Sequence, residues 1–305
     1  MNNKLISYNL HLINIVSNLY WKSNKNKVII INTHILGDKP SPKRYPKYRK
    51  EIAKMNIIKD IIYGSQDPVS QVLDLYLPEC ENADVFIYFH GGGLINGDKA
   101  GKTGISSMAQ LTERGKIVIS ANYRMYPTAK FPEFVEDAAM VVAWAKKNLS
   151  NYTTFNKIFI GGSSAGAWLT AMLAYDKKYL GAHSIRTTEI DGYVIDAAQL
   201  TSHFNVIKEH GYDSRRIIVD ESAPVYFVDE TTDFPNIFIF VADNDMPCRY
   251  EQTQMFLKTL ERFHCPPEKI RYKLMEGFTH CKYTGNEEFI DLVYDYMETT
   301  QADVN

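Results

Sequence analysis

The stretch that decides the fold is Gly162-Ser163-Ser164-Ala165-Gly166. The apolar run 157–161 precedes it, and a helix-like run, residues 168–175, follows it. Glycines two positions before and after Ser164 permit a turn that is too tight for larger side chains. A serine in such a turn lies above the edge of the sheet, in front of the N–H groups of the next helix. The pattern predicts a nucleophile at Ser164, although the pentapeptide alone is also compatible with a packing turn.

A second glycine-rich stretch lies upstream, where the apolar run 83–89 leads into His90-Gly91-Gly92-Gly93. Strand propensity does not explain three consecutive glycines, because glycine weakens a strand. Glycines let the backbone approach a ligand and turn its N–H groups outward, as an oxyanion hole requires. We therefore predict that the N–H groups of Gly92, Gly93 and Ala165 stabilise a tetrahedral intermediate, each by about 3 kcal/mol. The alternative for the glycines is a flexible turn.

A general base and its acid should follow the serine, in the order serine, acid, histidine. His280 comes after a predicted strand at residues 271–276, so its imidazole can reach Ser164. The buried run 236–241 precedes two carboxylates, Asp243 and Asp245. Asp245 lies three positions after Ala242, the small residue that ends the strand, and is the predicted partner of the imidazole. Asp243 remains the alternative, since an aspartate there can also hydrogen-bond the turn backbone.

The apolar pattern predicts the organisation of the chain. Short apolar runs alternate with helix-like stretches such as residues 134–148 and 250–264. This alternation favours a mostly parallel sheet with helices on both faces, and the motifs above fall at the carboxyl ends of its strands. The predicted strands cover residues 85–89, 117–120, 157–160, 193–195, 237–241 and 272–275.

The first part of the chain differs from the rest. Apolar residues between Leu5 and Tyr20 recur at helical spacing, so we predict a helical extension over residues 1–55 before a catalytic domain over residues 56–305. The extension either caps the active site or only packs on the core. It lacks the features of a secretory signal, and the sequence has no apolar run long enough to span a membrane, so we expect a cytoplasmic protein.

Several of these stretches together resemble one superfamily. The segments 73–78 (Leu-Asp-Leu-Tyr-Leu-Pro) and 122–127 (Asn-Tyr-Arg-Met-Tyr-Pro) accompany the glycine loop and the serine turn. Over about residues 60–300 the chain resembles the hormone-sensitive-lipase-like and feruloyl and acetyl-xylan esterase-like (BD-FAE-like) branches of the α/β-hydrolases. The chain departs from many lipase-like members at Ser163, where they carry aspartate, and at Ala167, where they carry glycine.

The resemblance implies an α/β-hydrolase fold with an N-terminal helical cap segment and a serine carboxylesterase that needs no cofactor or metal. It assigns Ser164 as nucleophile, His280 as base and Asp245 as acid, with Gly92, Gly93 and Ala165 as the oxyanion hole. The expected substrates are short-chain acyl or aryl esters, hydrolysed through an acyl-enzyme. Two alternatives remain, an arylformamidase-like amide hydrolase and a non-catalytic ligand-binding protein on the same fold.

Composition agrees with one large enzyme core, since 45% of the 305 residues are hydrophobic. The net charge of −2 gives no reason to expect nucleic acid as a partner, and the resemblance adds a homodimer as an expectation. Four cysteines do not form a disulfide framework in a chain of this length, so reduced thiols are expected. The predicted insertion between two strands carries four aromatic side chains that could line an apolar wall of the site: Phe204, Tyr212, Tyr226 and Phe227.

Overall fold

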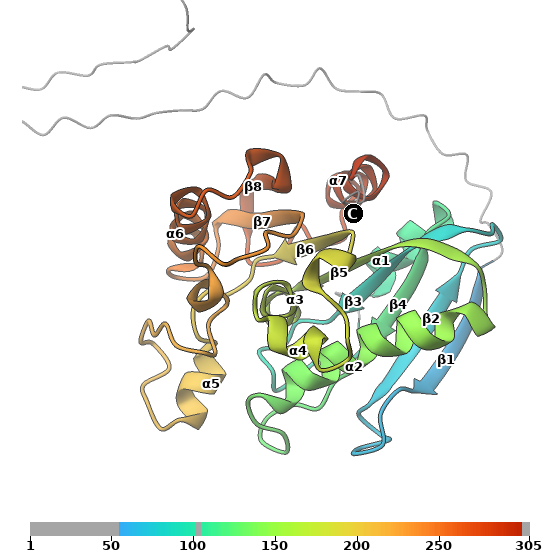
Figure 1. Cartoon of the computed structure of the whole chain (residues 1–305), viewed down its shortest axis with the longest axis horizontal. Coiled ribbons are helices and arrows are strands. Elements are labelled where there is room, and N and C mark those ends of the chain that lie inside the picture. Colours follow the sequence, from blue (N-terminus) through green and yellow to red (C-terminus); the bar gives the residue numbers. More distant parts are fainter. Residues whose placement is uncertain (1–54, 102–104, 301–305) are drawn as a thin grey trace, which may run out of the picture. The chain divides into compact units, whose positions relative to one another are not determined.

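The computed structural model describes residues 55–101 and 105–300, and its core is one sheet of eight strands (Figure 1). Their sequences are rich in the β-branched and aromatic residues that suit a buried pleated surface. The strands are β1 (Asn56–Ile62), β2 (Val72–Leu77), β3 (Ala83–Phe89), β4 (Ile117–Ala121), β5 (Phe155–Ser163), β6 (Gly192–Asp196), β7 (Ile237–Asn244) and β8 (Ile270–Thr279).

The order of the strands across the sheet is β1-β2-β4-β3-β5-β6-β7-β8. β2 pairs antiparallel with both β1 and β4, and all other neighbours are parallel. The carboxyl ends of the parallel strands therefore lie at one edge of the sheet, where ligands bind in open α/β folds. The segments that follow β3, β5, β7 and β8 carry the motifs singled out from the sequence.

Helices cover both faces of the sheet, because the strands bury apolar side chains on each side. One hydrophobic cluster joins α2, α3 and α6 to one face, and a second joins α1 and α7 to the other. In Figure 1, α2, α3 and α4 lie together on one side of the sheet. The helices are α1 (Ile105–Glu113), α2 (Glu133–Asn148), α3 (Ala165–Tyr175), α4 (Lys177–Gly181), α5 (Phe204–Glu209), α6 (Arg249–Arg262) and α7 (Glu287–Thr299).

The predicted parallel sheet with helices on both faces is confirmed. Each predicted strand lies within an observed one, and the helix predicted over residues 134–148 is α2. The predicted N-terminal extension lies almost wholly outside the described residues, as does the question of whether it caps the site. None of the helices in the described ranges is both long and apolar enough to cross a membrane.

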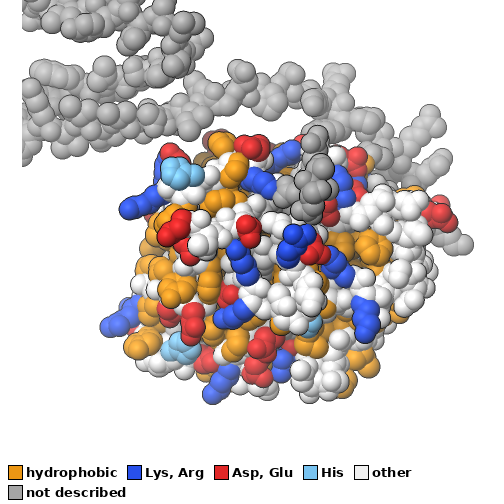
Figure 2. All heavy atoms as spheres, in the orientation of Figure 1, with side chains coloured by type: hydrophobic (Ala, Val, Ile, Leu, Met, Phe, Trp, Pro, Cys, Tyr) orange, Lys and Arg blue, Asp and Glu red, His pale blue; other side chains and the backbone are white. Residues whose placement is uncertain are grey.

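The surface agrees with the balanced charge of the sequence. Figure 2 shows acidic and basic side chains interspersed on the described part of the face that carries α2 and α4. Several of these charges form surface ion pairs, such as Lys146 with Glu189 at 3.0 Å and Lys177 with Asp233 at 3.0 Å. Exposed pairs of this kind contribute little to stability.

Candidate active site

The turn between β5 and α3 holds Ser164 in a strained conformation. Its φ of 55° and ψ of −110° are unusual for a residue other than glycine. The neighbouring glycines explain how the turn closes. A Cβ at Gly166 would lie 2.0 Å from the Phe89 carbonyl oxygen, and one at Gly162 would lie 2.4 Å from the Gly166 backbone. The position of Ser164 is therefore fixed by close backbone packing that only glycine permits.

The structure brings together three side chains that are far apart in sequence. The hydroxyl Oγ of Ser164 lies 2.8 Å from Nε2 of His280, and Nδ1 of His280 lies 2.6 Å from Oδ1 of Asp245. Ser164 follows β5, Asp245 follows β7 and His280 follows β8, so the sheet edge itself assembles them. With Nδ1–H donating to the carboxylate, Nε2 is free to accept the serine proton.

The side chain of Asp245 is fully buried, whereas that of His280 is 22% exposed. Burial alone would raise the pKa of Asp245. The hydrogen bond and charge of His280 outweigh it, helped by the Met246 and Ala242 amides, and hold this pKa below its usual value. A carboxylate that stays ionised here can stabilise a positive imidazolium.

Asp243, the alternative acid, has a different position. Its Oδ1 accepts hydrogen bonds from the backbone N–H of Gly277, at 2.8 Å, and from the Asn244 side chain, at 3.0 Å. The residue is exposed and ties the end of β7 to β8. The structure therefore brings Asp245, and not Asp243, to the imidazole.

The glycine loop after β3 lies directly against the serine turn. Gly92 and Gly93 have φ values of 121° and 67°, which favour glycine. No acceptor among the described residues takes their N–H groups, and Ala165 begins α3, so its N–H has no acceptor within the helix. Three free donors thus lie at the positions singled out from the sequence.

Two contacts hold the glycine loop in shape. The first involves His90, whose ring stacks on that of Tyr123 with 4.5 Å between the ring centroids. The Nδ1 atom of His90 lies 2.8 Å from the carbonyl oxygen of Gly91. Burial lowers the pKa of His90, so the ring is neutral and Nδ1–H donates to that carbonyl. The second is a hydrogen bond from the side-chain amide of Asn205 to the Gly93 carbonyl. Sequence reasoning missed Asn205, because it lies in an insertion without periodicity.

A buried carboxylate beneath the serine turn was also missed. Asp196 ends β6 and pairs with Ser163 at the end of β5. Its Oδ2 accepts hydrogen bonds from Ser163 Oγ at 2.5 Å and from Thr284 Oγ1 at 2.6 Å, and its carbonyl accepts the N–H of Ser164 at 2.8 Å. Burial raises the pKa of Asp196, against the lowering effect of these donors. The carboxylate that contacts Ser163 thus comes from the neighbouring strand.

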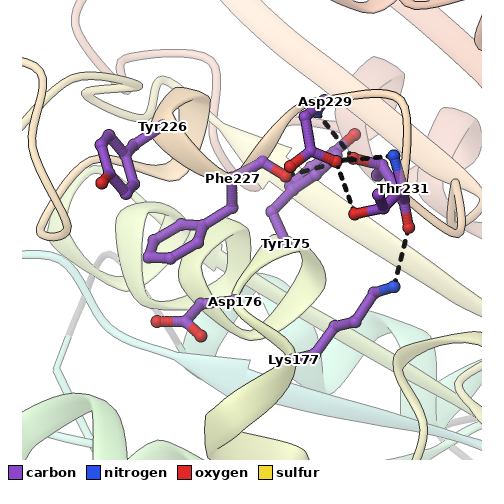
Figure 3. Close-up of a pocket in the computed structure, with 8 residues that line it drawn as sticks. Tyr175, Asp176, Lys177, Tyr226, Phe227, Asp229 and Thr231 are labelled. Atoms are coloured by element: carbon purple, nitrogen blue, oxygen red, sulfur yellow. Dashed lines mark hydrogen bonds between the residues drawn. The ribbon is translucent and has the colours of Figure 1, made fainter.

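The aromatic side chains expected to line one wall are separated in space. Phe204 lies against the glycine loop, 3.1 Å from where a Cβ of Gly93 would be. Tyr226 and Phe227 instead line a pocket of about 360 Å³ with Tyr175 and Lys177 (Figure 3). Tyr175 ends α3, whereas Ser164 precedes its first residue, so the helix separates this pocket from the serine by about 16 Å. Tyr212 is exposed on the surface.

The arrangement suits acyl transfer. Within residues 55–101 and 105–300, no three histidine, cysteine or acidic side chains are grouped to hold a metal ion. The four cysteines are free. What the geometry offers is a serine hydroxyl, an imidazole to take its proton, a carboxylate behind the imidazole and free N–H groups beside the hydroxyl.

This fold and this turn define the class of the protein. A mostly parallel sheet whose fifth strand ends in a strained serine turn, with a histidine after the last strand, is an α/β-hydrolase. The BD-FAE family model matches residues 73–260, which is more than half of the chain. The chain therefore belongs to the BD-FAE family.

Individual relatives and solved structures agree. Esterase LipC of Mycobacterium tuberculosis is 27% identical over 143 residues, covering 44% of this chain and 34% of the relative. An isoprenylcysteine alpha-carbonyl methylesterase of Arabidopsis thaliana is 35% identical over 135 residues, covering 43% of this chain and 31% of the relative. The matched regions thus span about a third of these relatives. A carbohydrate esterase from gut microbiota shares the fold with a TM-score of 0.69 at 20% identity, over 82% of this chain and 98% of that one.

Proposed function

We propose that the protein is a serine carboxylesterase that hydrolyses small acyl or aryl esters through an acyl-enzyme. The observation that carries this proposal is the continuous chain of hydrogen bonds from Ser164 through His280 to Asp245. The free N–H groups beside the hydroxyl and the membership of the BD-FAE family support it. The named relatives act as esterases, which agrees with this reaction.

In the proposed reaction, His280 Nε2 takes the proton of Ser164 Oγ as this oxygen attacks the ester carbonyl carbon. The carbonyl oxygen becomes an oxyanion, which the N–H groups of Gly92, Gly93 and Ala165 stabilise. The intermediate then collapses, and the alcohol leaves with the proton from His280. Water, activated by the same imidazole, releases the carboxylic acid and restores the serine. In both steps, Asp245 keeps the His280 ring in the tautomer that is protonated at Nδ1 and stabilises the imidazolium.

The direct test measures hydrolysis of p-nitrophenyl esters from acetate to long acyl chains, with methyl ferulate and N-formylkynurenine beside them. We expect short esters to be cleaved and Ser164→Ala to lose about 10⁶-fold in kcat, because the nucleophile is gone. Circular dichroism of the variant controls for folding. Equal activity of the wild type and Ser164→Ala would overturn the proposal, and cleavage of N-formylkynurenine alone would replace it with an amide hydrolase.

The serine can also be tested without knowledge of the substrate. A fluorophosphonate probe forms a covalent bond with an activated serine in any hydrolase of this mechanism. We expect labelling of the wild type at Ser164 and none of Ser164→Ala. A folded wild-type protein that is not labelled would contradict an activated serine and favour a binding protein on the same fold.

A further inference from the structure

Arg249 is a buried arginine without a partner. It begins α6 between the exposed residues Cys248 and Tyr250, yet it is itself only 4% exposed. Its guanidinium forms no hydrogen bond or ion pair with any residue in the described ranges. Withdrawing an unpaired charge from water is costly, so such a group calls for an explanation. A guanidinium offers five N–H donors and no acceptor, and it keeps its charge in proteins.

The electrostatic neighbours of Arg249 belong to the candidate active site. Burial lowers the pKa of Arg249, while the nearby Asp245 and Cys281 act in the opposite direction. Asp245 is the carboxylate that contacts the imidazole, and Cys281 directly follows His280. The backbone agrees, since the N–H of Arg249 donates to the Met246 carbonyl at 3.0 Å and the N–H of Met246 donates to Asp245 Oδ1 at 2.7 Å. Arg249 therefore lies near the Ser164–His280–Asp245 chain, but outside its hydrogen bonds.

A second buried donor, His203, lies in the segment next to the start of α6, where Thr201 Oγ1 donates to Gln252 Oε1 at 3.2 Å. Its ring centroid is 5.5 Å from that of Trp168 and 4.3 Å from that of Phe204, and its Nδ1 accepts the N–H of Asn205 at 3.2 Å. Burial and the charge of Arg249 lower the pKa of His203 to about 3. The ring is thus neutral, and because Nδ1 accepts, Nε2 carries the proton. No described residue accepts this Nε2–H.

His203 lies beside the serine turn and the glycine loop. Trp168 lies one turn along α3 from Ser164, and Phe204 and Asn205 contact the glycine loop at Gly93. Neither the guanidinium nor the Nε2 atom is fully enclosed, since each keeps a little accessible surface despite the burial of its residue. Each is therefore a donor that keeps some accessible surface and has no acceptor among the described residues.

The ligand chemistry follows from the donors. A planar carboxylate can accept two parallel hydrogen bonds from the N–H groups of a guanidinium, and a further one from a neutral imidazole N–H. An apolar acyl chain would leave all of these donors unpaired. We propose that Arg249 and the Nε2–H of His203 form a carboxylate-binding subsite, and that the substrates are esters carrying a free carboxylate. This inference rests on the proposed esterase activity and names its substrate class.

The test compares pairs of esters that differ by a carboxylate. Monomethyl adipate is paired with methyl hexanoate, and 4-acetoxybutanoate with butyl acetate, so that the carboxylate lies on the acyl side or on the alcohol side. Hydrolysis is followed by base uptake at constant pH. We expect kcat/KM of the wild type to be at least about 10-fold higher for the charged member of one pair, as one charge-assisted contact provides.

Variants of Arg249 assign this preference to the guanidinium. In Arg249→Met, the ratio of charged to neutral kcat/KM should fall by about 10- to 100-fold. Arg249→Lys should recover part of the ratio, because lysine restores the positive charge but cannot form the paired hydrogen bonds of a guanidinium. Arg262→Met, at the exposed far end of the same helix, is the matched control and should keep the wild-type ratio. No charged preference in either pair, or an unchanged ratio in Arg249→Met, would overturn the subsite.

Binding gives a readout that does not depend on turnover. Adipate should raise the melting temperature of the wild type and of Ser164→Ala, but not that of Arg249→Met. Fluorophosphonate labelling separates the two proposals. A labelled wild type that neither prefers charged esters nor responds to adipate loses the subsite and keeps the esterase. An unlabelled protein that adipate stabilises through Arg249 loses the esterase and keeps the anion site.

Discussion

At the scale of single residues, two aspartates that are two positions apart in the sequence have different tasks. Asp245 contacts His280, whereas Asp243 accepts the N–H of Gly277 in β8. We expect Asp245→Asn to lower kcat by about 10⁴-fold, because the imidazole loses both its tautomer and its counter-charge. Asp243→Asn keeps an oxygen acceptor for Gly277 and should change kcat by less than about 10-fold. Steady-state kinetics of both variants on one short ester measure the two effects. A larger loss of kcat in Asp243→Asn than in Asp245→Asn would make Asp243 the acid.

Individual residues also show where sequence reasoning ends. The contact between Ser164 and His280 was predictable, because each residue follows a recognisable strand whose end lies at the same edge of the sheet. Asp196 and Arg249 were not, since a lone acid at a strand end and a lone arginine at a helix start have many ordinary explanations. Their importance arises from pairing across strands and from burial, which are long-range properties of the folded chain.

At the scale of elements, the turn between β5 and α3 depends on its glycines. In Gly166→Ala, the new methyl group would overlap the Phe89 carbonyl at 2.0 Å, and neither partner is a movable side chain. We expect a loss of about 3 kcal/mol in the free energy of unfolding, and a larger relative loss of activity because the serine shifts. Urea unfolding and ester hydrolysis measure the two effects.

The matched control for this substitution is Gly181→Ala, in the last turn of α4. A Cβ there meets nothing within 4 Å. The variant should be more stable than the wild type by about 0.5 kcal/mol, because alanine is the better helix residue. Equal stability of the two glycine variants would contradict close packing as the reason for the glycines in the serine turn.

The elements themselves differ in how well the sequence predicts them. The core strands and α2 were predictable, because their apolar patterns are long and regular. The insertion before β7 was not, because α5 has only 6 residues and the remaining turns are irregular. The strand order β1-β2-β4-β3 is likewise absent from local patterns, since it depends on which distant segments pair.

At the scale of the whole molecule, buried histidines make stability depend on pH. His90 is 2% exposed and His203 is 1% exposed, and burial lowers the pKa of both, that of His203 to about 3. Such residues bind fewer protons in the folded chain than in the unfolded chain, where the pKa is about 6.5. The free energy of unfolding therefore falls as pH falls below this value. Well above pH 7, both states hold the rings neutral and the effect vanishes.

The size of this effect is large enough to measure for His203 alone. Between pH 7 and pH 5 it amounts to about 2 kcal/mol, a substantial part of the 5–15 kcal/mol typical of folded domains. In His203→Asn, the side-chain oxygen can still accept the N–H of Asn205, but nothing titrates in this range. We expect its unfolding free energy, measured by urea at both pH values, to fall about 2 kcal/mol less than that of the wild type. The exposed His183→Asn is the control and should follow the wild type. If His203→Asn loses as much stability as the wild type, His203 is not held neutral by the fold, and the assignment of its proton to Nε2 fails with it.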